Sequence, residues 1–458
     1  MADAGGTPVL TPGLTHARVL RIALPIVLSN ATIPILGAVD TAVIGQLGQA
    51  APMGAVAMGA VILASVYWIF GFLRMGTTGL VAQAHGAGDR AEVSAVLIRA
   101  LLIGLAAGLG IVLLQNVLFW AAFAVAPASM EVEGFARVYL NIRIWGAPAT
   151  IALYAITGWL IAQERTRSVL VVQVLMNGLN VGLDLWFVRA LGWGVQGWGV
   201  QGVALATLIA EWSGLALGLW LCRDALGRQM RSRARLFDAA RLARMLAVNA
   251  DIMVRSVVLQ ASFTAFVFLG AGLGDATLAA NQVLMLFLEI TAYALDGFAF
   301  AAEALVGAAV GAGLRSEVRQ AGIFASQWGF GGAVALALLF WLFGPWVIDL
   351  MTTAPEVRSI ARTYLPWLAV APLIGIASWM MDGIYIGATW TRPMRNAMLQ
   401  SVAIYALAVA ILVPLFGNYG LWAALMVLNI ARAVTLGLRY PALEAGVQVQ
   451  SARPVPTA

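Results

Sequence analysis

Long apolar stretches dominate this sequence and recur roughly every 35 residues along its whole length. A helix needs about 20 apolar residues to cross the hydrocarbon core of a bilayer, and most of the stretches exceed that length. The chain is 62% hydrophobic and only 10% charged, whereas a soluble domain carries about 25% charged residues. Short alternating segments, which a spanning barrel requires, are not seen. The sequence therefore predicts an all-α, polytopic membrane protein.

We expect twelve transmembrane helices, at residues 17–46, 54–83, 93–126, 134–163, 167–189, 195–222, 239–270, 277–310, 316–349, 357–387, 394–415 and 419–440. All 27 basic residues are arginine. With the N-terminus in the cytoplasm, twenty of them fall on the cytoplasmic side, three (Arg74, Arg143 and Arg255) lie within spans, and only four fall outside: Arg137, Arg189, Arg358 and Arg362. Basic residues accumulate in cytoplasmic loops, so we expect both termini to be cytoplasmic. The N-terminus does not resemble a signal peptide.

Two regions of the sequence repeat at one fixed offset. Residues 76–93 and 301–318 share nine of eighteen positions at an offset of 225, and the same offset aligns Tyr139-Leu140 with Tyr364-Leu365. One offset that serves separate regions indicates an internal duplication. Each half contains six spans, so both halves have the same orientation, and a pseudo-twofold axis along the membrane normal should relate them. Two pseudo-symmetric six-helix bundles with a cleft between them are typical of a transporter.

The duplication also suggests a division of the chain into five parts. We expect an N-terminal tail at 1–16, a first bundle at 17–222, a basic linker at 223–241, a second bundle at 242–440 and a C-terminal tail at 441–458, with the linker and both tails in the cytoplasm. The net charge of +6 then reflects membrane topology and not nucleic-acid binding.

Acidic residues inside the predicted spans are the strongest candidates for function, because a charge at the bilayer centre costs about 2.5–3.5 kcal/mol on insertion scales. Asp40 and Asp184 lie at similar depths in the first and fifth spans, and Asn180 shares a helical face with Asp184. Two carboxylates and an amide could bind a proton or Na⁺, and repulsion within the pair would raise its apparent pKa. The alternative is a polar contact that merely holds helices together.

A second group of embedded charges lies in the second half. Glu289, Asp296 and Glu303 recur every seven residues, which places them on one stripe of the eighth span. Asp382 lies in the tenth span, and Arg255 in the seventh could neutralise one of these acids. Either a polar site in this bundle or a fixed buried ion pair is consistent with the pattern.

The remaining chemistry-bearing residues are few. Two histidines and one cysteine provide neither a catalytic dyad nor a metal cluster. We therefore expect no enzyme activity, no cofactor and no resident metal, apart from Na⁺ should it be the coupling ion at Asp40, Asn180 and Asp184.

Four segments carry a family resemblance: "LPIVLSNATIPILGAVDTAVIGQLG" (24–48), "FGFLRMGTTGLVAQAHGAGD" (70–89), "LDGFAFAAEALVGAAVGAG" (295–313) and "MDGIYIGATWTRPMRNA" (381–397). They strongly resemble the MATE (multidrug and toxic compound extrusion) transporters. Within that family, the resemblance is greatest to the DinF subfamily. The resemblance covers residues 20–440. It implies a V-shaped protein of two bundles that exports organic compounds in exchange for protons or Na⁺.

The resemblance also implies particular site residues. In the DinF branch a cation site lies in the N-terminal bundle, and Asp40, Asn180 and Asp184 match its pattern. Thr207 matches the polar partner on the sixth helix, and Tyr139 is a further contact. Pro25 matches the proline at which the first helix has been proposed to bend. Related branches place a cation-binding acid in the C-terminal bundle, where Asp382 or the stripe of acids could serve.

The combined interpretation is a secondary transporter of the bacterial inner membrane. It would export cationic or amphipathic organic compounds in antiport with protons, or with Na⁺, by alternating access, and we expect a monomer in the lipid bilayer. The alternative is a flippase for lipid-linked saccharides, which would need a larger cleft lined by basic residues; the embedded charge is mainly acidic. A membrane-bound enzyme or scaffold fits less well, because neither explains the paired acids.

Overall fold

The computed structural model consists of helices joined by short turns. It describes residues 13–45, 50–126, 128–190, 199–229 and 233–447; within these ranges the side chains of 33–42, 44–45, 189–190, 228–229 and 233–234 are not described. No strand occurs among the residues described. This agrees with the prediction of an all-α membrane protein.

The first half of the chain forms six passes, three of which are interrupted. The elements are α1 (His16–Gly45), α2 (Ala50–Ile69), α3 (Phe72–Gly86), α4 (Arg90–Leu113), α5 (Gln115–Val125), α6 (Met130–Arg143), the 3₁₀ turn η1 (Ile144–Gly146), α7 (Ala147–Ala162), α8 (Thr166–Leu185), the π-helical turn η2 (Trp186–Ala190) and α9 (Gly199–Leu221). In the pairs α2–α3, α4–α5 and α6–α7, the second helix follows the first almost directly along the chain. The second, third and fourth predicted spans are therefore each a broken helix.

The second half contains longer, less interrupted helices: α12 (Ala239–Ala271), α13 (Asp275–Gly311), α14 (Arg315–Met351), α15 (Pro355–Gly387) and α16 (Thr391–Gly437). The stretch expected as a linker holds two short helices, α10 (Arg223–Gln229) and α11 (Arg233–Leu236). The expected C-terminal tail begins inside α17 (Tyr440–Ala445), where Glu444 accepts a hydrogen bond from Arg319 at 3.0 Å.

The element α16 is two helices joined at a reversal of the chain. Gly417 has φ 56° and ψ −129°, which is outside the helical range and favours glycine. On either side of it the chain runs antiparallel, because Ser401 Oγ lies 3.2 Å from Thr435 Oγ1 and Arg439 donates to Gln400 at 2.7 Å. Ten described helical stretches are long and apolar enough to span a membrane. With α1 added and α16 counted as two helices, the described chain makes the twelve predicted passes.

The internal duplication appears in the backbone as well as in the sequence. Gly88 and Gly313, which are 225 residues apart, both have positive φ, at 72° and 70°. Glu164 and Thr389 are related by the same offset and have φ of 58° and 51°, although neither is glycine. Equivalent turns thus end equivalent helices in the two halves, as a duplicated, parallel repeat requires.

The halves touch through a reciprocal contact between α3 and α13. A Cβ atom on Gly86 would overlap the backbone carbonyl of Ala308, and a Cβ on Gly311 would overlap that of Gln83. These two contacts are exchanged by the 225-residue offset, so the pseudo-twofold axis passes between α3 and α13. Glycine is required at both positions because the backbones themselves are in contact.

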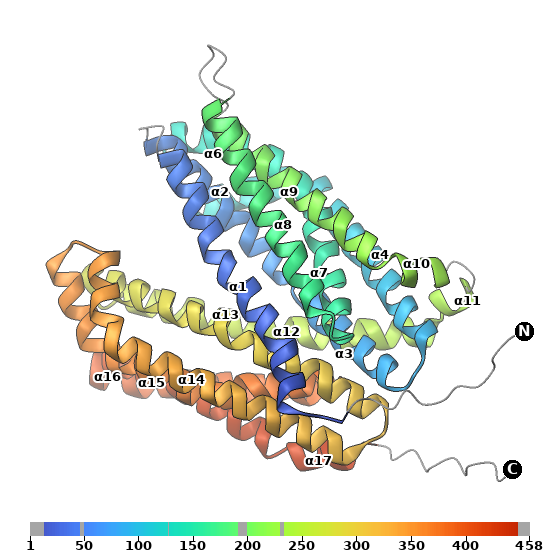
Figure 1. Ribbon diagram of the computed structural model, residues 1–458. Coiled ribbons are helices and arrows are strands. Elements are labelled where there is room, and N and C mark those ends of the chain that lie inside the picture. The colour runs from blue at the N-terminus through green and yellow to red at the C-terminus, as the bar shows by residue number, and fades with distance from the viewer. Residues whose placement is uncertain (1–12, 46–49, 127, 191–198, 230–232, 448–458) are drawn as a thin grey trace, which may run out of the picture.

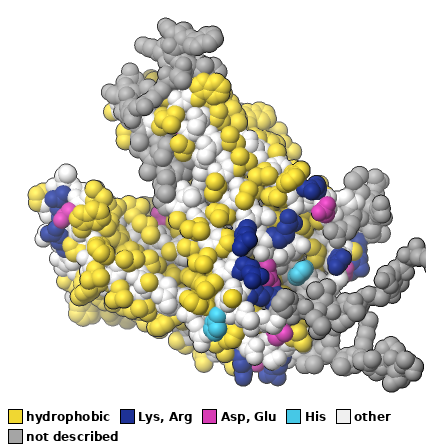
Figure 2. Space-filling model, viewed as in Figure 1, with side chains coloured by type: hydrophobic (Ala, Val, Ile, Leu, Met, Phe, Trp, Pro, Cys, Tyr) yellow, Lys and Arg dark blue, Asp and Glu magenta, His cyan; other side chains and the backbone are white. Residues whose placement is uncertain are grey.

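The molecule is V-shaped (Figure 1). Helices α1–α9, the N-terminal bundle, form one arm, and α12–α16, the C-terminal bundle, form the other. The start of α1, the short helices α10 and α11, and α17 lie on the side where the arms join. Figure 2 shows an open gap between the arms on the opposite side, apolar side chains over most of both arms, and arginines gathered mainly near the junction.

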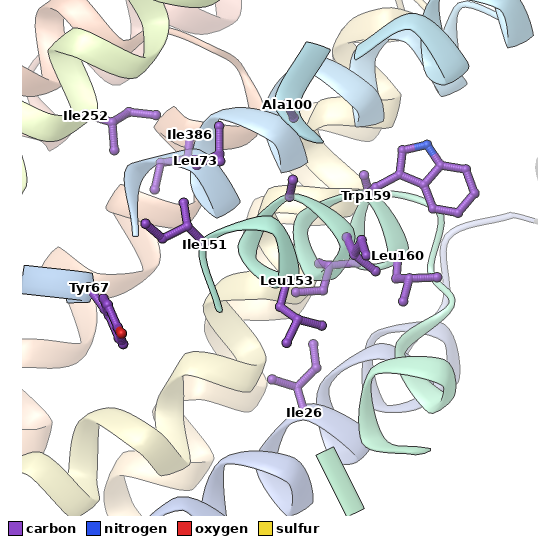
Figure 3. Close-up of a cluster of buried hydrophobic side chains, with 14 of the residues drawn as sticks. Ile26, Tyr67, Leu73, Ala100, Ile151, Leu153, Trp159, Leu160, Ile252 and Ile386 are labelled. Atoms are coloured by element: carbon purple, nitrogen blue, oxygen red, sulfur yellow. The ribbon is translucent and has the colours of Figure 1, made fainter. Parts of the chain in front are cut away.

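The junction has a continuous apolar core. Ile26 of α1 and Leu73 of α3 belong to the same buried cluster as Ile252 of α12 and Ile386 of α15 (Figure 3). One charged pair crosses within it, because the buried guanidinium of Arg74 on α3 donates to both carboxylate oxygens of Glu303 on α13, at 3.0 and 3.3 Å. The bundles are therefore held together by packing and by a bidentate ion pair.

Replacing either glycine of the reciprocal contact should loosen the junction. Gly86→Ala and Gly311→Ala each force a methyl group against the backbone of the opposite bundle, and such overpacking typically costs about 1–3 kcal/mol. We expect both variants to lower the unfolding temperature of the detergent-solubilised protein by similar amounts, measured by intrinsic fluorescence on heating.

Gly110→Ala is the matched control, since no atom lies within 4 Å of a Cβ built at this position in α4. Its unfolding temperature should be unchanged or raised, because alanine is favoured over glycine in a helix by roughly 0.5–1 kcal/mol. Equal unfolding temperatures for Gly86→Ala and Gly110→Ala would contradict the close contact.

Candidate ion-coupling site

The N-terminal bundle contains a small, fully buried polar group on α8 and α9. Asn180 and Asp184 of α8 are 1% and 0% exposed. Asn180 Nδ2 donates to Thr207 Oγ1 of α9 at 2.9 Å, and Thr207 donates in turn to the backbone carbonyl of Val203 at 3.0 Å. The spacing of four residues brings Asn180 and Asp184 to one face of α8, as predicted. The structure thus places Thr207 beside the predicted amide.

The amide oxygen of Asn180 is the unusual atom in this group. It is buried and accepts no hydrogen bond from the described residues. Buried polar atoms are nearly always satisfied, so an acceptor of this kind points to a water molecule or an ion as its partner. Amide, hydroxyl and carboxylate oxygens are also the ligands that hard cations prefer. The group is therefore chemically suited to hold a proton on Asp184 or a small hard cation.

Asp40 belongs to α1, but its side chain lies outside the described part of the structure. Its pairing with Asp184 stays a prediction. The helices that carry the two acids are in contact, since Asn177 Nδ2 of α8 donates to Thr32 Oγ1 of α1 at 2.6 Å. Pro25 lies within α1, two turns before Thr32, and is half-buried.

Tyr139 is buried on α6, where its ring packs against Gly59 of α2. It lies one turn before Arg143, which forms a buried ion pair with Glu211 of α9 at 2.7 Å. Glu211 in turn follows Thr207 by one turn. A neutralised ion pair thus lies next to the predicted site. The sequence showed both charges inside spans, but it did not indicate that they pair.

Two of the charges predicted for a C-terminal polar site belong to a buried cluster with a third. The carboxylate of Asp382 on α15 binds the guanidinium groups of Arg255 on α12 and Arg432 on α16, the latter at 2.5 Å. All three side chains are less than a tenth exposed. Arg432 is one of the twenty arginines expected on the cytoplasmic side, and the second helix of α16 carries it into the bundle, where it is buried.

The three acids of the predicted stripe on α13 lie in three different environments. Glu303 is buried in its ion pair with Arg74. Asp296 is half-buried, and Glu289 is exposed and accepts a hydrogen bond from Tyr293 at 3.0 Å. Of the described arginines, none forms an ion pair with Glu289 or Asp296. Asp296 nevertheless lies within electrostatic reach of Glu303, Arg255 and Asp382, whereas Glu289 is exposed; a polar site in this bundle stays a prediction. Across the described residues, no three His, Cys, Asp or Glu side chains are grouped as metal ligands.

This architecture is that of a membrane transporter built from a duplicated six-helix unit. The MatE family model matches the chain twice, at residues 25–186 and 252–412, once in each bundle. The chain therefore belongs to the MATE family of transporters.

Individual relatives agree with this assignment. DNA damage-inducible protein F of Escherichia coli (strain K12) is 40% identical over 426 residues, which are 91% of this chain and 90% of that protein. A probable multidrug resistance protein NorM of Neisseria meningitidis serogroup B is 26% identical over 92% of this chain and 93% of its own length.

Solved structures share the fold at lower sequence identity. An outward-facing multidrug resistance MATE family transporter of the MOP superfamily superimposes with a TM-score of 0.85 and is 19% identical, covering 95% of this chain and 97% of its own. A MOP superfamily transporter from Pyrococcus furiosus, described as having a binding pocket of reverse polarity, gives a TM-score of 0.82 at 18% identity, over 94% and 96% of the two chains. These likenesses confirm the predicted fold.

Asp382 should be needed for stability. Asp382→Asn removes the carboxylate that pairs with two buried guanidinium groups, and removing one partner of a buried pair typically costs about 3–5 kcal/mol. We expect a large fall in the unfolding temperature or loss of folded protein. Glu133→Gln is the control, because the pair between Arg137 and Glu133 is solvent-exposed and is worth about 0.3–0.5 kcal/mol. An Asp382→Asn protein that unfolds like the wild type but fails to transport would instead assign Asp382 to ion coupling.

Proposed function

We propose that this transporter exports cationic or amphipathic organic compounds across a bacterial inner membrane in exchange for protons. Relatives named as multidrug resistance proteins support the substrate class. The observation that carries the coupling proposal is the fully buried carboxylate of Asp184, next to Asn180 and its unsatisfied amide oxygen. A buried ionised carboxylate is costly unless it is compensated, so its protonation changes the energy of the surrounding helices.

The orientation follows from charge. Arginines gather mainly at the junction, and basic residues favour the cytoplasmic side of a membrane. Both ends of the chain would then be cytoplasmic, and the gap between the arms would open to the outside. In this state a bound compound can leave to the exterior while a proton enters the coupling site from the same side.

Coupling requires that the site bind its ion with different affinities in the two conformations, because only differential binding shifts an equilibrium. Asp184 and Asp40 would share one proton in the outward-open state. Protonation would remove the repulsion between the carboxylates and allow α1 to bend at Pro25. That bend would change how the N-terminal bundle packs, and the proton would be released once the cleft opens to the cytoplasm. Na⁺ could occupy the same oxygen ligands, and the experiment below separates the two ions.

Substitution of the acids should abolish coupling and leave the fold intact. In proteoliposomes we expect Asp184→Asn and Asp40→Asn to lose ethidium transport driven by a pH gradient, with the double variant little worse than either single one, since residues that act as a unit are not additive. If a pH gradient does not drive ethidium transport, a sodium gradient is imposed at equal pH. Transport under that gradient would identify Na⁺ as the coupling ion.

Asp349→Asn serves as the control, because this acid is partly exposed at the end of α14, where it pairs with Arg362. It should transport at the wild-type rate. Wild-type, gradient-driven transport by folded Asp184→Asn protein would refute the proposed coupling site.

A further inference from the structure

A pocket of about 410 Å³ lies at the closed end of the V, between the two bundles. Its polar wall consists of Gln83, Asp89, Glu92, Arg99, Arg241 and Arg244. Its apolar floor includes Leu80 and Val96 from the N-terminal bundle and Met245 from the C-terminal bundle. The volume is within the usual range for small-molecule sites, which is about 300–1,000 Å³. We call it the junction pocket; it is separate from the coupling site on α8 and α9.

Both carboxylates of the junction pocket are already occupied by arginines. Glu92 binds Arg99 at 2.9 Å through one oxygen and Arg241 through the other. Asp89 accepts from Arg235 at 2.6 Å and from the backbone N–H of Glu92 at 3.1 Å. Partial burial raises the pKa of Asp89, but these two hydrogen bonds outweigh it and hold the pKa below its ordinary value. Asp89 is thus ionised at neutral pH, and its charge is compensated by Arg235.

Arg244 is the cation that remains uncompensated. Its Nη2 donates to Gln83 Oε1 at 2.9 Å and to Thr389 Oγ1 at 3.3 Å, both of which are neutral acceptors. It forms no ion pair with any carboxylate of the described chain. Arg241 also lies 3.8 Å from Asp238. Four guanidinium groups, counting Arg235, thus surround three carboxylates, which leaves one positive charge in excess. The excess of positive charge lies at the mouth of a cavity with an apolar floor.

From this arrangement we infer that the junction pocket binds a phosphate group, held by Arg244 and Arg241 and placed above the apolar floor. Guanidinium groups bind phosphate oxygens through directed, charge-assisted hydrogen bonds. The phosphate could belong to an anionic phospholipid or to a small phosphate compound in solution. Anionic headgroups attract basic residues at a membrane surface. Neither source depends on the transport function proposed above.

Occupation of the pocket would link the two bundles. Arg241 and Arg244 are on α12, whereas Gln83, Glu92 and Val96 are on α3 and α4. Gln83 already bridges the junction, donating to the carbonyl of Gly387 at 3.2 Å and to Thr389 at 3.0 Å. A ligand that binds only when these walls are together stabilises the closed junction. At a free concentration 100 times its Kd, it shifts the ratio of closed to open junction roughly 100-fold.

The test uses the purified full-length protein in detergent. Short-chain phosphatidylglycerol, short-chain phosphatidylcholine and inorganic phosphate are titrated, with binding followed by calorimetry and by the unfolding temperature. We expect saturable binding of phosphatidylglycerol with a rise in unfolding temperature, and at least tenfold weaker binding of phosphatidylcholine. Binding by inorganic phosphate as well would identify a soluble phosphate as sufficient; binding by phosphatidylglycerol alone would identify a lipid.

Arg244→Gln should weaken binding at least tenfold, and Arg244→Lys should retain part of it. Arg223→Gln is the matched control, because Arg223 is an exposed arginine of α10 that does not line the pocket. It should bind like the wild type. An excess of salt should abolish phosphate binding by the wild-type protein and by every variant that binds. The inference is overturned if neither phosphate probe binds, or if Arg244→Gln and Arg223→Gln bind with the same affinity.

Discussion

The backbone contact between α3 and α13 is the constraint on which the rest of the structure depends. Gly86 and Gly311 allow these helices to touch at one end of the molecule, where each approaches the backbone of the opposite bundle. The bundles diverge from it, so the gap between the arms follows from how closely the two helices meet. The Arg74–Glu303 pair and the apolar cluster around Ile26 and Ile252 stabilise the same junction.

Several of the embedded acids are paired with arginines. Glu211, Glu303 and Asp382 each face a buried guanidinium group, which suits them to hold helices together. Asp184 is fully buried on the same face of α8 as Asn180, which is hydrogen-bonded to Thr207. An arginine beside a carboxylate favours its ionised form, so the three acids paired with arginines are held in the charged state. The partners of a buried acid, which sequence alone does not reveal, therefore decide whether it holds helices together.

Much of the fold was predictable because apolar length and the 225-residue repeat are properties of the sequence alone. The breaks at Gly71 and Leu114 were not, since they interrupt stretches that remain apolar throughout. The proximity of Asn180 and Asp184 followed from helical spacing, whereas the contact with Thr207 came from family resemblance. The ion pairs were not predictable from the sequence. Arg432 reaches Asp382 only because α16 reverses at Gly417. No local pattern indicates which buried arginine meets which acid across 50 or more residues.

The junction ion pair also breaks the symmetry of the duplicated halves. The 225-residue offset relates Arg74 to Ala299 and Glu303 to Thr78, so each half contributes only one charge. Two copies of the first half, joined by the same axis, would bury a pair of arginines with no acid opposite. Two copies of the second half would bury a pair of glutamates. Association of two identical halves through this contact is therefore disfavoured relative to pairing of the first half with the second.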